Sequence, residues 1–127
     1  MEQTERIPAL RTIAMPADTN PRGDIFGGWL LAQMDLAGSI LAQKIARQRI
    51  ATVGVQAMTF HKPVFVGDEV SCYTDLVRIG NTSVTVQVES WARRRDEENE
   101  IKVTEGQFTY VAIDENRRPV QIPKDSI

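Results

Sequence analysis

Residues 25–43 form the segment that most constrains the fold of this chain. They read IFGGWLLAQMDLAGSILAQ, and Asp35 is the single ionisable side chain among them. Leu, Ala, Met and Gln favour a helix, which we expect to continue to about Arg47. Apolar residues cover most of its circumference, so protein should surround this helix. An unpartnered carboxylate in such a place is costly, so Asp35 needs a partner or a chemical task.

The rest of the chain reads as strands and turns. Val84, Val86 and Val88 alternate with polar residues, a period of two that predicts a strand with one buried face. Gly106 suggests a bulge in the last strand. Segment 16–24 is rich in turn-forming residues, and segment 94–100 is a charged hairpin loop. The predicted strands span residues 10–15, 51–62, 69–79, 82–93 and 101–113.

This order of elements predicts an α+β fold in which one long helix packs against a curved antiparallel sheet. The connections between the later strands are short, which favours antiparallel neighbours. One helix on one sheet leaves apolar surface uncovered around Gly38 and along the strands. We therefore expect self-association, at least as a dimer.

Size and composition predict one domain over residues 1–127. The net charge of −2 favours neither nucleic acid nor an anionic membrane as a partner. Cys72 is the lone cysteine and is expected in the core, without a disulfide. Segment 25–43 approaches the length of a membrane span, but it contains Asp35, two glutamines and three glycines and lacks a basic flank. The N-terminus does not read as a secretory signal, so a cytoplasmic location is expected.

Two segments carry a family resemblance. PADTNPRGDIFGGWLLAQMD and the later TVGVQAMTFHKPVFVGDEV resemble the hot-dog fold acyl-CoA thioester hydrolases of the bacterial YciA type, and the likeness runs from about residue 10 to residue 123. The resemblance implies a curved sheet wrapped around a central helix. It also implies hydrolysis of acyl-CoA to a free acid and CoA, with no metal or cofactor. Dimers whose sheets join edge to edge, commonly assembled into hexamers as trimers of dimers, would be the working form.

The resemblance also implies which residues act. Asn20 in the loop before the helix, Asp35 in the helix and Thr52 on the next strand match the functional positions of the family. The site would be shared, with the asparagine and helix start of one subunit facing the aspartate of the other. One position departs from the pattern: Asn81 stands where a basic residue often follows the glycine of the turn.

The residues themselves allow the same chemistry. Asp35 can act as a general base on water or as a nucleophile that forms an anhydride, and the sequence does not separate these roles. Gly27 and Gly28 permit close approach to the free amides of a helix start, an arrangement suited to an oxyanion, although glycines can also simply begin a helix tightly. An aspartate bonded only to a neighbouring subunit is the alternative for Asp35.

Other candidates have structural alternatives. Asn20 can position the water or polarise the carbonyl, but asparagine before proline also makes turns. Asp24 is expected to cap the helix rather than to catalyse. Thr52 can orient Asp35 or the water, or be an ordinary strand threonine. His61, the single histidine, is expected at the surface or at a strand edge, and Trp29 is expected to pack, although it could reach the pantetheine arm.

CoA needs contacts for its phosphates. The arginines at 93–95 are candidates, but the acidic residues beside them favour a solvated hairpin. The predicted CoA contacts are Gly27, Lys62, Gly80, Asn81, Thr82 and Ser83.

Two rival functions are alternatives to hydrolysis. A hot-dog dehydratase or hydratase needs a histidine beside a carboxylate, and His61 lies outside the helix motif. A non-catalytic acyl-CoA sensor would tolerate loss of Asp35 and would usually carry an effector segment, for which this sequence leaves little room. The pairing of Asn20 with Asp35 favours the hydrolase.

Overall fold

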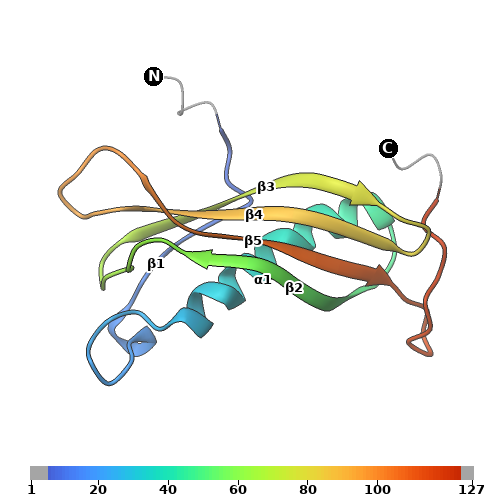
Figure 1. The fold of residues 1–127 in the computed structure, drawn as a ribbon, viewed down its shortest axis with the longest axis horizontal. Helices are drawn as coiled ribbons and strands as arrows, with labels where there is room; N and C mark the ends of the chain where they lie inside the picture. Colours follow the sequence, from blue (N-terminus) through green and yellow to red (C-terminus); the bar gives the residue numbers. More distant parts are fainter. Residues whose placement is uncertain (1–5, 124–127) are drawn as a thin grey trace.

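The computed structural model describes residues 6–123, which form one helix and one sheet (Figure 1). In chain order the elements are β1 (Leu10–Ile13), the 3-10 turn η2 (Pro16–Asp18), α1 (Gly27–Ala46), β2 (Ile50–Phe60), β3 (Glu69–Ile79), β4 (Ser83–Arg93) and β5 (Ile101–Ala112). The sequence predicted the helix and every one of these strands to within about three residues at each end. Among the described residues, no helix is both long and apolar enough to cross a membrane.

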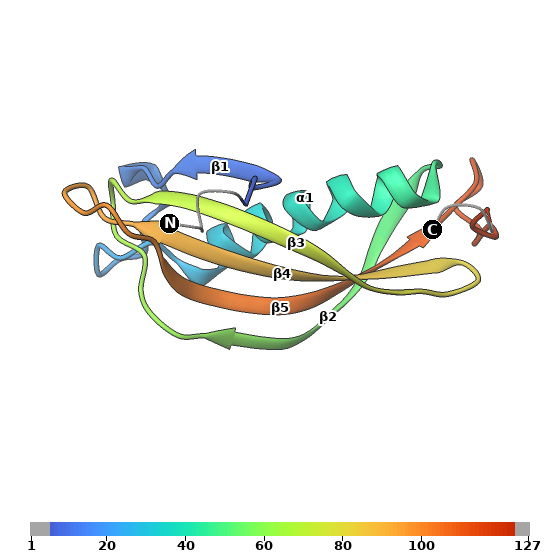
Figure 2. The ribbon, with the colours of Figure 1, turned by 90° about the horizontal axis from the view of Figure 1, so that it is seen from above.

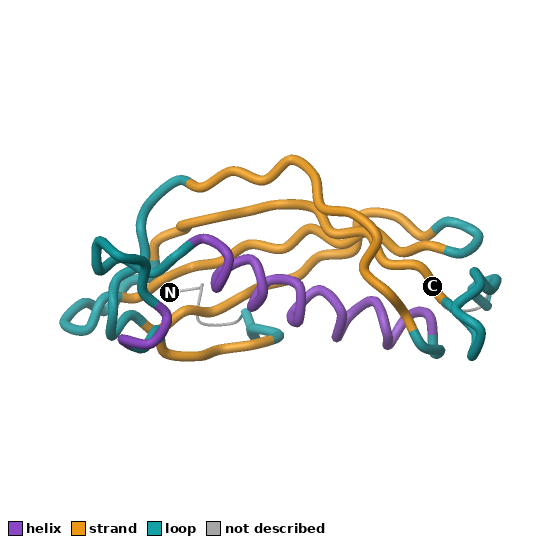
Figure 3. The backbone as a smooth tube through the Cα atoms, turned by 90° about the horizontal axis from the view of Figure 1, so that it is seen from below, coloured by secondary structure: helices purple, strands orange, loops and turns teal. Residues whose placement is uncertain are grey.

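The five strands form one antiparallel sheet in the order β1-β3-β4-β5-β2. The sheet curves, and α1 lies along its concave side (Figures 2 and 3). This is the helix-on-sheet arrangement that the sequence predicted. β1 and β2 are the edge strands, so each offers one side of its backbone to solvent or to another chain.

The core lies between α1 and the central strands. Val84, Val86 and Val88 are buried, as the alternation in the sequence predicted, and Phe108 and Tyr110 extend this apolar layer on β5. The helix presents mainly small side chains to the sheet, which brings the two backbones close together. Its buried residues are Leu30, Met34, Ala37, Gly38, Ala42 and Ala46. Cys72 is also in this core, as expected.

β2 contains a β-bulge opposite Gly106, whereas the sequence predicted the bulge on β5. The register between β2 and β5 shifts between Gln56 and Thr59, and Ala57 on the inserted stretch has a positive φ of 56°. Gly106 stays in regular pairing with Val88, so the predicted bulge at Gly106 is wrong. A Cβ at position 106 would lie 2.2 Å from the Met58 sulfur, so this glycine makes room for the bulge across from it.

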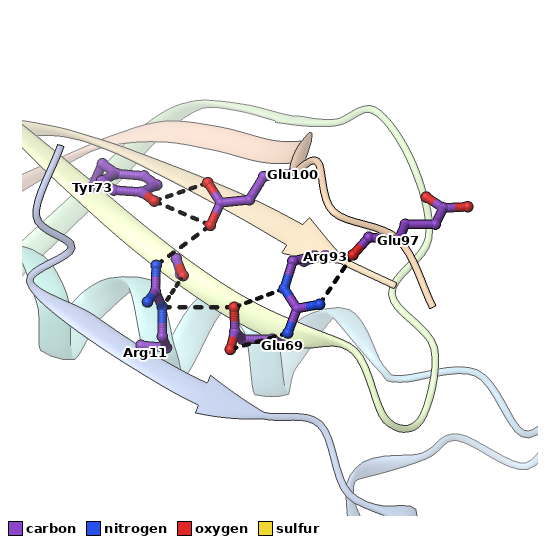
Figure 4. Close-up of polar contacts among 7 residues, drawn as sticks. Arg11, Glu69, Tyr73, Arg93, Glu97 and Glu100 are labelled. Carbon is purple, nitrogen blue, oxygen red and sulfur yellow. Dashed lines mark hydrogen bonds and ion pairs between the residues drawn. The ribbon is translucent and has the colours of Figure 1, made fainter. Parts of the chain in front are cut away.

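The outer face of the sheet carries a polar network (Figure 4). Glu69 on β3 accepts hydrogen bonds from Arg93 on β4, and Arg11 on β1 lies within ion-pair distance of Glu69 and of Glu100. The Tyr73 hydroxyl donates to Glu100 at 2.8 Å. These contacts join β1, β3, β4 and the start of β5 on the side away from α1.

Candidate active site

Asp35 lies in the middle of α1, on the side that faces β2. Its side chain is half-buried, and the Thr52 hydroxyl donates a hydrogen bond to Asp35 Oδ1 at 2.9 Å. Thr52 is on β2 and is itself exposed, because β2 is an edge strand. The structure therefore brings together two of the residues that the sequence proposed, the carboxylate and the strand threonine.

A third residue, which the sequence analysis did not single out, also reaches Asp35. The Tyr110 hydroxyl donates to the backbone carbonyl of Asp35 at 2.8 Å. Burial of the phenol raises the pKa of Tyr110, and the nearby Asp35 carboxylate raises it further, so the hydroxyl keeps its proton. The sequence contains a strand tyrosine and a helix glycine, but nothing in it connects them. Only the register of β5 under α1 brings Tyr110 to Gly38.

The helix start has free amides. Phe26 is the N-cap residue, has extended backbone and provides no side-chain cap. Within residues 6–123, the backbone amides of Gly27 and Gly28 have no hydrogen-bond partner, as expected for the first positions of a helix without a cap. Both glycines are exposed. Two donors therefore point outward from the positive end of the helix dipole.

Asp24 does not cap the helix, so that prediction was wrong. The Ile25 amide donates to the Val64 carbonyl, and the Phe26 amide donates to the Asp18 carbonyl. These bonds hold the chain extended through Phe26, so the helix begins too late for Asp24 to serve as its cap.

Asn20 makes the turn that precedes the helix. Its Oδ1 accepts hydrogen bonds from the amides of Arg22 and Asp24, at 2.9 and 3.1 Å. This is the turn-making role that the sequence analysis set beside the catalytic one. Among the described residues, the Nδ2 group of Asn20 has no partner, so that donor is available to a ligand or to a second chain.

A cavity of about 310 Å³ opens beside the helix start. One wall is the beginning of α1, and the other is the end of β2 with the segment that follows it. Most of its lining is apolar, with His61 and Lys62 as polar members. The full lining is Ile25, Phe26, Gly27, Leu30, Phe60, His61, Lys62, Pro63 and Val64.

The predicted oxyanion donors and the predicted catalytic carboxylate are far apart within one chain. Gly28 and Asp35 are seven residues apart on the same helix, which is about 10 Å along its axis at 1.5 Å per residue. A thioester carbonyl cannot be within hydrogen-bond reach of both groups. One carbonyl therefore cannot contact the Gly28 amide and the Asp35 carboxylate of the same chain directly.

The predicted CoA contacts also fall into two groups. Gly27 and Lys62 lie at the cavity by the helix start. The β3–β4 turn, residues 80–83, is at the opposite end of the sheet, near the C-terminal end of α1 (Figures 1 and 2). There the Asn81 and Thr82 carbonyls accept from Ile122 and Ala112, so the polar tail packs against the turn.

The basic residues near the hairpin have structural partners. Arg93 bonds to Glu69, and Arg94 forms an ion pair of 2.5 Å with Asp68, whose side chain is only 4% exposed. This matches the view that the arginine run is a structural hairpin. His61 is exposed, as expected, and its Nε2 lies 2.7 Å from Glu105. Trp29 packs against the core, as expected.

Metal chemistry has no obvious site in the part of the chain that the structure describes. No group of three His, Cys, Asp or Glu side chains is arranged there to hold an ion. The chemistry available at α1 is thus that of a carboxylate, a hydroxyl and backbone amides. A carboxylate can take a proton from water, and the amides can bind a negative oxygen.

Known proteins resemble this chain in sequence and in fold. A family model described as the thioesterase superfamily matches residues 22–98. The YciA protein of Escherichia coli strain K12, named as an acyl-CoA thioester hydrolase, is 48% identical over 130 residues, covering 97% of this chain and 98% of that protein. A hexameric thioesterase from Yersinia pestis has a TM-score of 0.88 at 48% identity, over 94% of this chain and 98% of that chain. A hexameric broad-specificity acyl-coenzyme A thioesterase has a TM-score of 0.89 at 44% identity, over 95% and 89% of the two chains.

Proposed function

The chain belongs to the thioesterase superfamily, and from that membership we propose that it hydrolyses acyl-CoA thioesters to a free carboxylic acid and CoA. The observation that carries the proposal is the Asp35 carboxylate held by Thr52 on a helix whose first amides are free. A carboxylate activates the attacking group, and the amides stabilise the oxyanion. Both are what hydrolysis of a thioester requires.

In the general-base form of the reaction, Asp35 takes a proton from a water molecule as that water attacks the thioester carbonyl. The carbonyl oxygen becomes negative and accepts hydrogen bonds from the amides of Gly28 and Gly27. The C–S bond then breaks, and the CoA thiolate leaves and receives the proton that Asp35 took from the water, which restores the carboxylate. In the nucleophile form, Asp35 itself attacks, CoA leaves, and water hydrolyses the resulting anhydride.

We place this site between two copies of the chain. The separation of about 10 Å between Gly28 and Asp35 supports this placement, because a second copy can bring its helix start to the first copy's carboxylate. β2 is an edge strand with exposed Val53 and Val55, so its free side suits pairing of two sheets. Asn20 would then contribute through its Nδ2 group. Assembly of three such dimers into a hexamer is proposed from the hexameric structures that this chain resembles.

A site shared between two subunits also accounts for the two separate groups of predicted CoA contacts. Lys62 and Gly27 of one copy lie beside the cavity, whereas the turn at 80–83 lies at the far end of the same copy. One CoA can meet both groups only if two subunits supply them. The acyl chain would run along α1 between the subunits, and we propose short to medium chains with broad acceptance.

No cofactor or metal enters the proposed reaction, since water, the carboxylate and the amides supply every step. CoA is part of the substrate and of the product. A cytoplasmic location and the absence of nucleic-acid or membrane partners stay predictions.

The test is release of free CoA thiol from a series of acyl-CoAs of increasing chain length. The natural protein should turn over part of the series, and Asp35→Asn should lose most of the activity while keeping its fold and its acyl-CoA binding. This substitution is nearly isosteric, so circular dichroism should be unchanged. An unfolded Asp35→Asn protein would make Asp35 structural. Binding without turnover by the natural protein would favour the acyl-CoA sensor.

A further inference from the structure

Tyr110 and Thr52 form a pair beneath Asp35. They are directly opposite each other on β5 and β2, so their side chains leave the same face of the sheet. Tyr110 binds the backbone carbonyl of Asp35 at 2.8 Å, and Thr52 binds its carboxylate at 2.9 Å. One residue of the helix is thus fixed at two points, its main chain and its side chain, by neighbouring positions of the sheet.

The absence of a side chain at Gly38 leaves space on the helix for the Tyr110 ring. A Cβ at Gly38 would lie 2.4 Å from the Tyr110 hydroxyl oxygen and 3.2 Å from its Cζ. Glycine in the middle of a helix costs roughly 1 kcal/mol relative to alanine. Gly38 is buried against the sheet, so its missing side chain is what lets Tyr110 reach the Asp35 carbonyl. This accounts for a glycine that helix propensity alone disfavours.

The Tyr110 hydroxyl cannot be replaced by solvent. The residue is 1% exposed, so substrate does not touch it and water does not compete for the bond. Its raised pKa keeps the hydroxyl a donor, and a donor is what the carbonyl needs. Any influence of Tyr110 on the reaction must pass through the position of Asp35.

We propose that Tyr110 is a positioning residue for the thioesterase reaction. Its hydrogen bond fixes the main chain of Asp35 so that the carboxylate can contact both Thr52 and the substrate. Gly38 provides the space that the Tyr110 side chain occupies. This inference rests on the proposed function. Displacement of a reacting group by about 1 Å can cost up to a hundredfold in rate, so a tether of this kind matters for kcat.

The first test is Tyr110→Phe, which removes one oxygen atom. We expect kcat to fall roughly tenfold while KM changes less than twofold, because the contact affects the reacting carboxylate and not the binding of CoA. Tyr73→Phe is the matched control. It also removes a hydrogen-bonded tyrosine hydroxyl, but its partner Glu100 is on the outer face of the sheet (Figure 4). Tyr73→Phe should leave both constants unchanged.

The second test is Gly38→Ala, alone and combined with Tyr110→Phe. The added Cβ should displace the phenol and lower kcat about as much as Tyr110→Phe does. The double variant should be no slower than the slower single variant, because both changes break the same contact. Multiplicative losses, or an unchanged kcat in Tyr110→Phe, would overturn the proposal.

A readout without turnover separates this proposal from the proposed function. The carboxyl ¹³C resonance of Asp35 should move in Tyr110→Phe and stay in place in Tyr73→Phe. A natural protein that hydrolyses no acyl-CoA contradicts the function, whereas an unmoved resonance contradicts the positioning role.

Discussion

The hydroxyl of Thr52 donates a hydrogen bond to the Asp35 carboxylate at 2.9 Å. A carboxylate without a hydrogen-bond partner can adopt several rotamers, only some of which point at a substrate. One hydrogen bond selects among them. The orientation of Asp35 therefore depends on a residue of a different element, seventeen positions further along the chain.

At the scale of single residues, we predict that Thr52→Val lowers kcat about threefold to tenfold. A typical hydrogen bond contributes about 0.5–1.5 kcal/mol, which corresponds to that range. The measurement is steady-state release of CoA thiol. Thr109→Val is the control, because it removes a threonine hydroxyl whose side-chain partner among the described residues is Thr85, on the outer face of the sheet. Equal effects of the two substitutions would contradict a special role for Thr52.

At the scale of elements, the loop between β2 and β3 is tied to the hairpin between β4 and β5. The Arg94 guanidinium pairs with buried Asp68, donates to the Pro63 carbonyl and lies over the Phe65 ring at 4.6 Å. Asp68 Oδ2 also accepts from the Phe65 amide at 2.9 Å. Residues 61–64 of this loop line the cavity, so the hairpin holds one wall of the candidate site in place.

Arg94→Leu should lower the free energy of unfolding by about 3 kcal/mol. It leaves the Asp68 carboxylate buried without its cation, and breaking a buried pair from one side is strongly destabilising. Urea denaturation followed by circular dichroism measures the change. Arg95→Leu, an exposed arginine on the same hairpin, should change stability by less than about 0.5 kcal/mol. A similar small value for Arg94→Leu would show that the tie is dispensable.

The ion pair between Arg93 and Glu69 on the outer face of the sheet should make the free energy of unfolding depend on pH. The Arg93 guanidinium, bonded to Glu69, holds the pKa of the Glu69 carboxyl below its ordinary value of 4.5. A lowered folded-state pKa stabilises the protein above pH 4.5, and this contribution is lost as pH falls through the folded value. The stability deficit of Arg93→Met should therefore be largest near pH 7 and shrink toward pH 3.

Urea midpoints from pH 3 to pH 7 measure this dependence. Arg78→Met, which removes an exposed arginine from β3, is the control, and its effect should stay constant over that range. A deficit of Arg93→Met that does not change with pH would exclude the link to Glu69.

The elements were predictable from sequence because each has a strong local signal. The long apolar helix and the alternating valines of β4 depend on residue types alone. The errors at Asp24 and Gly106 have a different origin. The helix start is set by backbone bonds from Ile25 to Val64 and from Phe26 to Asp18, and the bulge is set by Ala57 on the opposite strand. Such partners are distant in sequence, so local patterns do not reveal them.

The site was predictable in part for the same reason. Asp35 stands out as a charge in an apolar helix, and paired glycines mark the helix start. Thr52 entered only through the family resemblance, because an isolated strand threonine carries no signal. Tyr110 was missed, since its role depends on β5 lying under Gly38 and directly beside Thr52.

At the scale of the whole molecule, one surface should control both assembly and activity. β2 is an edge strand whose residues are mostly exposed, including Val53 at 59%. An exposed apolar edge of this length is prone to pair with another chain.

Val53→Lys should therefore weaken association and lower activity together. Light scattering and thiol release on the same samples measure the two effects. Ile13→Lys places the same charge on β1, at the opposite edge of the sheet, where Ile13 is 54% exposed, and it should leave the dimer intact. A fully active monomer would remove the argument for a shared site.

The distance between Gly28 and Asp35 along α1 has a statistical consequence for mixtures. In a symmetric pair of chains, each of the two sites takes its helix start from one chain and its carboxylate from the other. Mixing Asp35→Asn with Asn20→Ala, each expected to be inactive alone, gives hybrids in about half of the pairs, and each hybrid has one site with both groups intact. Refolding the two variants together should thus restore about a quarter of the natural activity, whereas sites contained within single chains would stay inactive in every mixture.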